Sequence, residues 1–150
     1  MSQSVSKIYV HITFSTKNRW PFIDDSIKHE LWAYIGGICK NLACSPVRIG
    51  GHNDHVHICC LLSRKIAPAK LLEEIKKESS RWIKTKGDPY AKFYWQDGYG
   101  IFSVNPLDVE KVSEYIDNQI EHHKKRTFQE ELLMFLKKYR VEYDERYLWQ

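Results

Sequence analysis

The chain has 150 residues, a length that suits one domain burying roughly two thirds of its unfolded surface. No stretch approaches the roughly 20 consecutive apolar residues that span a membrane, and residues 1–7 lack the apolar core of a signal peptide. We therefore expect a cytoplasmic protein. The four cysteines form no CxxC pair, which argues against a zinc knuckle or a disulfide framework.

The net charge of +4 is unevenly distributed along the chain. Residues 1–107 carry 15 Lys and Arg against 9 Asp and Glu, whereas residues 108–150 carry 8 against 10. Within the first part, residues 64–86 hold 8 basic and 3 acidic side chains. Such a patch suits a polyanion such as nucleic acid, although a solvated helix face accounts for it nearly as often.

Alternating apolar positions predict strands, and apolar positions at helical spacing predict helices. The short turn at Asn53-Asp54 makes the second and third strands an antiparallel hairpin. The predicted elements in chain order are a strand over 7–16, a helix from 24 or 25 to about 41, strands over 46–52 and 55–62, a helix over 68–84, a strand in the second half of 93–104, a helix from 105 to about 124, and a last helix from 127.

Capping residues mark the starts of the last two helices. Asn105 stands before Pro106, a cap followed by the residue that suits the first helical position. Thr127 and Glu130 have the spacing of a capping box. The helix that begins at Asn105 is expected to bury one apolar stripe, made of Val109, Val112, Ile116, Ile120 and His123.

The predicted order β-α-β-β-α-β, followed by additional C-terminal helices, is the ferredoxin-like plan. We therefore predict an α+β fold with a four-stranded antiparallel sheet and helices on one face. The open face of such a sheet commonly meets nucleic acid. Residues 1–150 are expected to form a single domain, with 127–150 as a C-terminal helical tail.

Two histidines flank a valine in the third predicted strand. Side chains alternate along a strand, so His55 and His57 project from one face, about 7 Å apart, while Val56 points to the other. Two imidazoles on one face can share a metal ion. Two ordinary, half-exposed strand histidines are an equally good interpretation of this motif alone.

A second polar cluster lies on the helix that follows the fourth strand. Tyr115, Gln119 and His122 have the spacing i, i+4 and i+7, which places them on one helical face. In isolation, a tyrosine packed on its own helix is the more common explanation. The cluster therefore indicates a functional site only when it is considered together with the histidine pair.

The combination of 55–57 (His-Val-His) with Tyr115 and Gln119 resembles the single-tyrosine HUH transposases, the small transposases of IS200-like insertion sequences. The stretches 50–54 (Gly-Gly-His-Asn-Asp) and 95–104 (Trp-Gln-Asp-Gly-Tyr-Gly-Ile-Phe-Ser-Val) add to the resemblance. REP-associated tyrosine transposases are relatives of this family. The resemblance spans nearly the whole chain, and the order and spacing of its motifs are more specific than any one of them.

The resemblance implies an enzyme that cleaves and rejoins single-stranded DNA at element ends. In such enzymes His55, His57 and Gln119 would hold a divalent metal, Mg²⁺ or Mn²⁺, beside the scissile phosphate. Tyr115 would be the nucleophile and would form a 5′-phosphotyrosine. His122 is a possible auxiliary residue that activates the tyrosine, although the metal is an alternative.

The resemblance also implies a homodimer and a substrate of single-stranded DNA with hairpin-containing ends. The sequence leaves open whether each active site is formed within one chain or shared between two. Basic residues expected to contact DNA phosphates are Lys17, Arg19, Arg48, Lys76, Lys77, Arg81 and Lys84. Trp20, Tyr94, Trp95 and Tyr99 are candidates for stacking on unpaired bases, although core packing explains each aromatic more often.

Two other functions remain open from the sequence. The chain could be a non-catalytic ferredoxin-like domain that binds nucleic acid and has structural histidines. It could also be a domesticated HUH endonuclease with a cellular role. A hydrolytic phosphodiesterase is a weaker alternative, because it gives Tyr115 and Gln119 no task.

Overall fold

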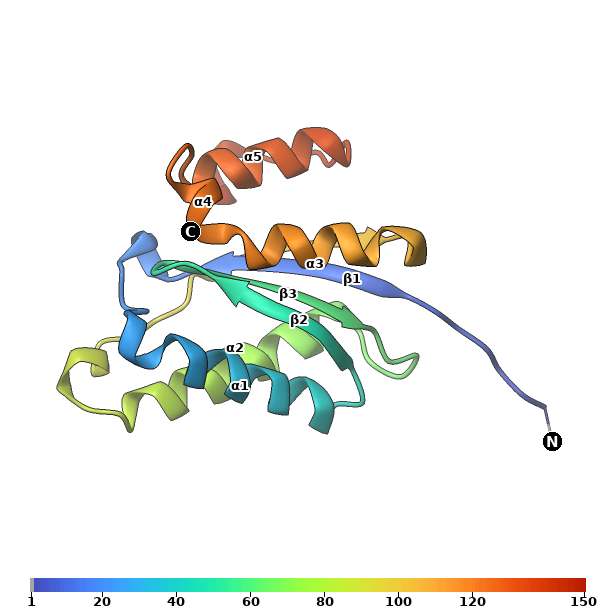
Figure 1. The fold of residues 1–150 in the computed structure, drawn as a ribbon, viewed down its shortest axis with the longest axis horizontal. Coiled ribbons are helices and arrows are strands. Elements are labelled where there is room, and N and C mark those ends of the chain that lie inside the picture. Colours follow the sequence, from blue (N-terminus) through green and yellow to red (C-terminus); the bar gives the residue numbers. More distant parts are fainter. Residues whose placement is uncertain (1) are drawn as a thin grey trace.

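A four-stranded antiparallel sheet lies at the centre of the computed structural model, which describes residues 2–150 (Figure 1). The strands lie side by side in the order β2-β3-β1-β4. Their bounds are Tyr9–Ser15 for β1, Ser45–Gly51 for β2, His55–Leu61 for β3 and Gly100–Val104 for β4. With the two helices described next, this order is the ferredoxin-like plan. The predicted α+β class and antiparallel sheet are confirmed.

Helices α1 (Asp25–Asn41) and α2 (Pro68–Lys84) cover one face of the sheet (Figure 1). Asp24 caps α1, because its carboxylate accepts hydrogen bonds from the backbone N–H groups of Ser26 and Ile27. One strand face and the apolar stripes of both helices form the main core. That core includes Ile12, Phe14, Leu31, Ile35, Ile58, Leu71 and Ile75.

The second face of the sheet is covered as well, which corrects the expectation of an open face. Figure 1 shows α3 (Val109–Asp117), α4 (Gln119–His123) and α5 (Phe128–Lys138) on the side opposite α1 and α2. Phe102 of β4 packs there in a smaller apolar cluster with Phe128, Leu132, Phe135 and Leu136 of α5. Nucleic acid therefore cannot lie flat across a bare sheet in this protein.

The helix predicted over 105–124 is broken into segments. A short 3₁₀ turn, Pro106–Asp108, leads into α3, and Asn118 separates α3 from α4 with φ of −99° and ψ of 24°. The break changes the direction of the helical face, and Ile120, which was expected in the buried stripe, is 53% exposed.

The last predicted helix begins as its capping residues indicate. Thr127 accepts a hydrogen bond from the backbone N–H of Glu130, and the Glu130 side chain accepts one from the backbone of Thr127, which completes the capping box of α5. A short helix, α6 (Glu145–Leu148), follows. The segment after residue 126 is therefore folded against the domain, where it closes the second layer of helices.

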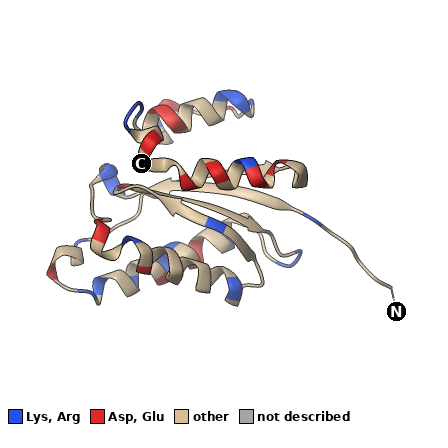
Figure 2. Cartoon of the chain, in the orientation of Figure 1, with Lys and Arg blue, Asp and Glu red and all other residues tan. Residues whose placement is uncertain are grey.

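Acidic residues are concentrated on one helix of the second layer. Figure 2 shows mainly Asp and Glu positions along α3, on the covered second face. Lysines and arginines are prominent on α2 and on the loop after β1. The acidic outer surface of α3 is therefore unsuited to contact with a phosphate backbone.

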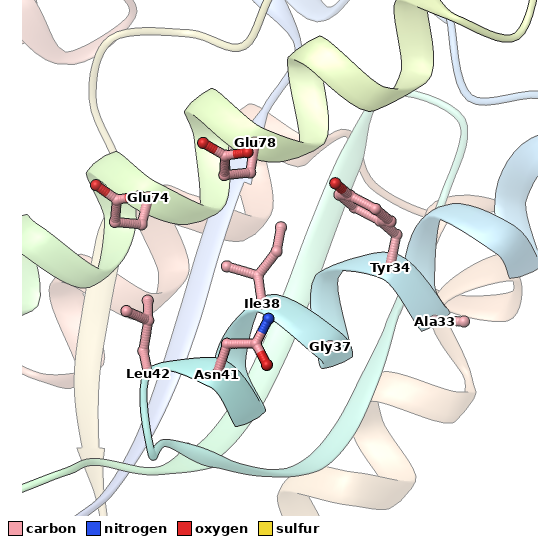
Figure 3. Close-up of a pocket in the computed structure, with 8 residues that line it drawn as sticks. All are labelled: Ala33, Tyr34, Gly37, Ile38, Asn41, Leu42, Glu74 and Glu78. Atoms are coloured by element: carbon pink, nitrogen blue, oxygen red, sulfur yellow. The ribbon is translucent and has the colours of Figure 1, made fainter.

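A hollow of about 410 Å³ lies between α1 and α2, on the layer remote from the histidine pair (Figure 3). Glu74 and Glu78 line it from α2. Each carboxylate is paired on its own helix, Glu74 with Lys77 at 3.2 Å and Glu78 with Arg81 at 3.6 Å. Across residues 2–150, no helix combines the length and apolar character needed to cross a membrane.

Candidate metal and nucleophile site

Strand β3 brings His55 and His57 to the sheet face that α4 and α5 cover. Both side chains are fully buried, and their ring centroids are 5.1 Å apart. The two histidines lie on one face of one strand, as predicted. They are not half-exposed, as two ordinary strand histidines would be.

Gln119, at the first position of α4, brings its amide to the first histidine. Its Oε1 lies 2.8 Å from Nε2 of His55 and 3.0 Å from Nε2 of His123. The amide nitrogen donates to the backbone carbonyl of Tyr115 at 3.3 Å. The carbonyl oxygen of Gln119 therefore points into the histidine cluster, as a metal ligand would.

Asp54 orients the ring of His55 from the opposite side. Its carboxylate lies 2.7 Å from Nδ1 of His55. Burial would raise the pKa of Asp54, but the hydrogen bond and charge of His55 hold that pKa below its usual value. When Nδ1–H donates to Asp54 in the neutral ring, the lone pair of Nε2 faces Oε1 of Gln119. Two acceptor atoms that face each other fit a shared cation, and a carboxylate behind a histidine is a common support for a metal ligand.

Glu131 of α5 is a member of the site that the sequence analysis did not identify. Its side chain is completely buried, and its Oε1 lies 2.8 Å from Nε2 of His57. Its Oε2 lies 3.4 Å from Nε2 of His123 and accepts a hydrogen bond from the Tyr115 hydroxyl. Burial alone would raise the pKa of Glu131, but hydrogen bonds from His123 and His57 bring it well below its ordinary value. The buried group is therefore a carboxylate, paired on both oxygens.

The donor set fits a divalent cation. One ligand atom from each of His55, His57, His123 and Glu131 lies within 4.8 Å of all the others, and the Gln119 oxygen contacts two of these histidines. Imidazole nitrogens with carboxylate and amide oxygens are suitable ligands for Mn²⁺, and such a nitrogen-rich set favours Mn²⁺ over Mg²⁺ in intrinsic affinity.

His11 of β1 supports His57 from behind. Its Nε2 lies 2.8 Å from Nδ1 of His57. Burial, together with the charge of His57, lowers the pKa of His11 to about 3. Burial also lowers the pKa of His57, although Glu131 opposes the shift. Both rings are neutral at physiological pH, which is the form in which a histidine binds metal.

Tyr115 of α3 lies against the same cluster. Its hydroxyl donates to Glu131, and its ring stacks on His122 with centroids 4.4 Å apart. Burial, followed by the charge and the hydrogen bond of Glu131, raises the pKa of Tyr115. The hydroxyl is therefore protonated at neutral pH. His122 contacts the aromatic ring of Tyr115, whereas the neighbouring His123 joins the ligand cluster.

A cavity of about 730 Å³ opens beside the tyrosine, between β4, α3 and α5. Its walls include His11 and Tyr115 at the site, and Lys111, Lys138 and Tyr139 further out. The cavity therefore places Lys111 and Lys138 in the same space as His11 and Tyr115.

The groups that sequence reasoning missed left weak signals. His11 pairs with Cys59 in the register, two positions from His57, so its proximity follows only once β1 and β3 are aligned. Glu131 interrupts the apolar stripe of α5 between Phe128 and Phe135, and a charged residue inside a buried stripe is unusual. The interruption was the available clue, but it does not indicate what the carboxylate contacts.

The predicted DNA-contacting residues fall into two groups. Lys76 Nζ donates to the carbonyls of Gln96, Asp97 and Gly98 at 2.7–3.1 Å, which uses all three of its protons. Arg48, Lys77 and Arg81 each pair with a carboxylate, within 3.6 Å. By contrast, within residues 2–150 none of Lys17, Arg19 and Lys84 forms an ion pair.

The comparisons with solved structures agree with the fold. A protein of Deinococcus radiodurans R1 named as a candidate transposase superposes with a TM-score of 0.62 at 20% identity, over 79% of this chain and 98% of that one. A REP-associated tyrosine transposase, solved bound to a REP hairpin, has a TM-score of 0.59 at 16% identity, over 82% of this chain and 74% of that one. No curated protein matches the chain.

The comparison with protein families identifies the family as well as the fold. The family model described as "Transposase IS200 like" matches residues 4–119, which include His55, His57, Tyr115 and Gln119 but not Glu131. The match covers well over half of the 150 residues. The chain therefore belongs to the IS200-like transposase family.

Proposed function

We propose that this protein is a DNA transposase that cleaves single-stranded DNA at element ends and rejoins it through a 5′-phosphotyrosine. One observation carries the proposal. The Tyr115 hydroxyl donates a hydrogen bond to Glu131, and the same carboxylate contacts His57. Gln119 contacts His55 and His123 in the same cluster. A nucleophile beside a candidate metal site, in a member of this family, fits phosphodiester transfer.

The residues that would hold the metal are His55, His57 and Gln119, joined by Glu131 and His123. A bound Mg²⁺ or Mn²⁺ would polarise the scissile phosphate and stabilise the charge that develops on it. Asp54 and His11 keep the two strand histidines in their orientations. These two contacts hold the proposed strand ligands in place.

Tyr115 supplies the nucleophile. Its oxygen forms a bond to phosphorus as the bond between phosphorus and the 3′-oxygen breaks, which leaves a 5′-phosphotyrosine and a 3′-hydroxyl. Because the hydroxyl is protonated at neutral pH, its proton must leave as the new bond forms. The proton would leave along the hydrogen bond to Glu131, and a bound metal ion would have to favour the transfer, because the pKa of Glu131 is lowered and that of Tyr115 is raised. The departing 3′-oxygen takes its proton from solvent.

The covalent link conserves the energy of the phosphodiester. A second 3′-hydroxyl can attack the same phosphorus and displace Tyr115, which rejoins DNA without ATP. Single-stranded DNA with hairpin-containing ends is the proposed substrate. It is supported by the REP-hairpin complex of the structurally similar transposase.

We also propose that the protein works as a homodimer, as the family resemblance implies. Within one chain, Tyr115 contacts Glu131 and Glu131 contacts His57, and on these contacts we propose a site formed within each subunit.

The test is incubation of the protein with single-stranded hairpin oligonucleotides and Mn²⁺, followed by a denaturing gel. A covalent protein–DNA adduct is expected for the wild type and for Tyr143→Phe, a control at a 47% exposed tyrosine. Tyr115→Phe should form no adduct while retaining DNA binding. Adducts that persist in Tyr115→Phe would contradict the assignment. Binding without any adduct in the wild type would favour a non-catalytic nucleic-acid-binding domain.

A further inference from the structure

The loop after β1 has an unusual backbone. Asn18 and Arg19 have φ values of 56° and 57°, in the left-handed region that side chains other than those of glycine, asparagine and aspartate rarely adopt. The surrounding contacts hold the loop in place: Thr16 Oγ1 donates to the Trp20 carbonyl at 2.6 Å, and Lys17 N donates to the Tyr94 carbonyl at 2.8 Å. Local strain that the fold maintains in this way often marks a functional segment.

Two aromatic side chains project from this region into solvent. Trp20 is 62% exposed and Tyr94 is 61% exposed. Together with Phe22 they line a hollow of about 470 Å³, within the size range of roughly 300–1,000 Å³ that is usual for small-ligand sites. Large aromatic surfaces left in water beside a hollow are suited to stacking on flat, unpaired bases.

Cations surround the same hollow. Lys17 and Lys92 line it, and Lys84 Nζ lies 4.6 Å from the centre of the Tyr94 ring. Arg19 belongs to the same loop but is not among the residues that line the hollow. Asp88 is the acidic residue at the hollow.

The hollow lies close to the catalytic cluster along the strand. Ser15 pairs directly with His55 in the sheet, and Thr16 N donates to the Asp54 carbonyl at 2.8 Å. The loop begins at the next residue, Lys17. A single strand whose phosphate lies at His55 would reach Trp20 around this end of the sheet, because Phe22 beside Trp20 packs against the core on the opposite sheet face.

We propose that Trp20 and Tyr94, with Lys17, Lys84 and Lys92, form a single-stranded DNA site that stacks bases and holds phosphates beside the strand pair of the catalytic centre. The inference rests on the proposed function for the identity of its ligand. It also separates the predicted basic residues: Lys17 and Lys84 serve the site, while Arg48, Lys77 and Arg81 are paired with carboxylates and Lys76 with carbonyls.

The test measures binding without chemistry. Tyr115→Phe protein is titrated, in EDTA, against a fluorescein-labelled dT12 oligonucleotide by fluorescence anisotropy. In this background, Trp20→Ala and Tyr94→Ala should each weaken binding about tenfold or more, since each removes a stacking platform. Trp20→Phe should restore most of the affinity. Tyr147→Ala is the matched control, because Tyr147 is also 61% exposed and also has a cation, Arg146, over its ring.

Two further measurements separate stacking from charge. An oligonucleotide with abasic positions should bind more weakly than dT12 when Trp20 and Tyr94 are both present. This difference between the two oligonucleotides should be smaller in Trp20→Ala and should vanish in the Trp20→Ala, Tyr94→Ala double variant. Lys92→Gln should reduce the slope of log K against log salt by about one, whereas Lys124→Gln, at a lysine paired with Glu121, should not change it.

The outcomes distinguish this site from the proposed catalysis. Unchanged affinity in Trp20→Ala and Tyr94→Ala, equal loss in Tyr147→Ala, or no binding of dT12 at all would overturn the proposed site. None of these results depends on adduct formation. Conversely, a protein that forms no adduct but loses dT12 binding in Trp20→Ala would retain this site and lose the transposase assignment. Thermal unfolding of each variant checks that the loop substitutions leave the fold intact.

Discussion

Glu131 Oε1 lies 2.8 Å from Nε2 of His57, although 74 residues separate the two in the chain. The other oxygen of Glu131 accepts the Tyr115 hydroxyl. One carboxylate from the C-terminal helical layer thus joins the proposed metal ligand on the sheet to the proposed nucleophile. The family model ends at residue 119, so this link is contributed by a segment beyond the matched region.

Replacement of Glu131 by Gln should weaken Mn²⁺ binding by about tenfold or more, because it removes the anionic member of the cluster and the partner of His57. Isothermal titration calorimetry on the DNA-free protein measures the affinity directly. Glu121→Gln is the control, since Glu121 is exposed on α4 and pairs only with Lys124. Equal affinities of Glu131→Gln and wild type would remove Glu131 from the ligand set.

Mixing His57→Ala protein with Tyr115→Phe protein should give no recovery of DNA cleavage. The reason is that His57, Tyr115 and Glu131 of one chain already contact one another, so each subunit of a mixed dimer lacks an essential group. Adduct formation on denaturing gels is the measurement. Recovered adducts would show that subunits exchange the tyrosine helix.

Gly51→Ala should destabilise the protein by about 2 kcal/mol, as overpacking does in other folds. A Cβ at Gly51 would lie 2.2 Å from the backbone oxygen of His55, so the start of β3 would have to move. Gly37→Ala in α1 should instead stabilise by about 0.5–1 kcal/mol, because nothing lies within 4 Å of its Cβ position. Urea unfolding of both variants tests the contrast. Gly51→Ala should also weaken Mn²⁺ binding through His55, and Gly37→Ala should not.

The cap of α1 predicts a pH-dependent stability. Hydrogen bonds from Ser26, with smaller contributions from Tyr90 and the helix N–H groups, lower the pKa of Asp24 in the folded state. Because the pKa of Asp24 is lower in the folded state, its carboxylate stabilises the fold at pH values above the pKa of the unfolded chain, about 3.9. This stabilisation is lost as the pH falls through the pKa of the folded state. Asp24→Ala should therefore cost about 1 kcal/mol at pH 7, and less as the pH falls below 4.

The control for the cap is Asp25→Ala. Asp25 is 99% exposed and pairs with Lys28 across one turn, an interaction that contributes little. Denaturant unfolding at pH 7 and pH 3 should show a pH-dependent difference from wild type for Asp24→Ala and almost none for Asp25→Ala. A constant difference at both pH values for Asp24→Ala would mean that the carboxylate is not the stabilising form.

Local sequence patterns predicted the fold well where the apolar residues are periodic or where a capping residue marks the end of a helix. Alternation in β1 and β3, the stripe of α2 over 68–84 and the capping box at Thr127 all appear as expected. The covered second face was missed, because the docking of α5 depends on long-range contacts such as Phe128 against His55. Nothing in the periodicity of α5 specifies which surface its apolar stripe contacts.

The site shows the same division between local and long-range information. A two-residue period placed His55 and His57 on one face, and helical spacing grouped Tyr115 with Gln119, but their expected roles came from the family resemblance. The roles of these four residues stay predictions until activity is measured. Glu131, His123 and His11 join them only through tertiary packing, and no sequence spacing relates them to the histidine pair.

The break at Asn118 has a mechanical consequence for strand exchange. In an unbroken helix, residues four apart lie on one continuous rod, so movement of Tyr115 would displace Gln119 with it. Here α3 and α4 are separate segments, joined at a residue with non-helical torsion angles. The two segments stay coupled, however, because the Gln119 amide donates to the Tyr115 carbonyl and His122 stacks on the tyrosine ring. Movement of a covalently attached DNA end on Tyr115 would therefore reach the proposed amide ligand through these side-chain contacts rather than through a rigid rod.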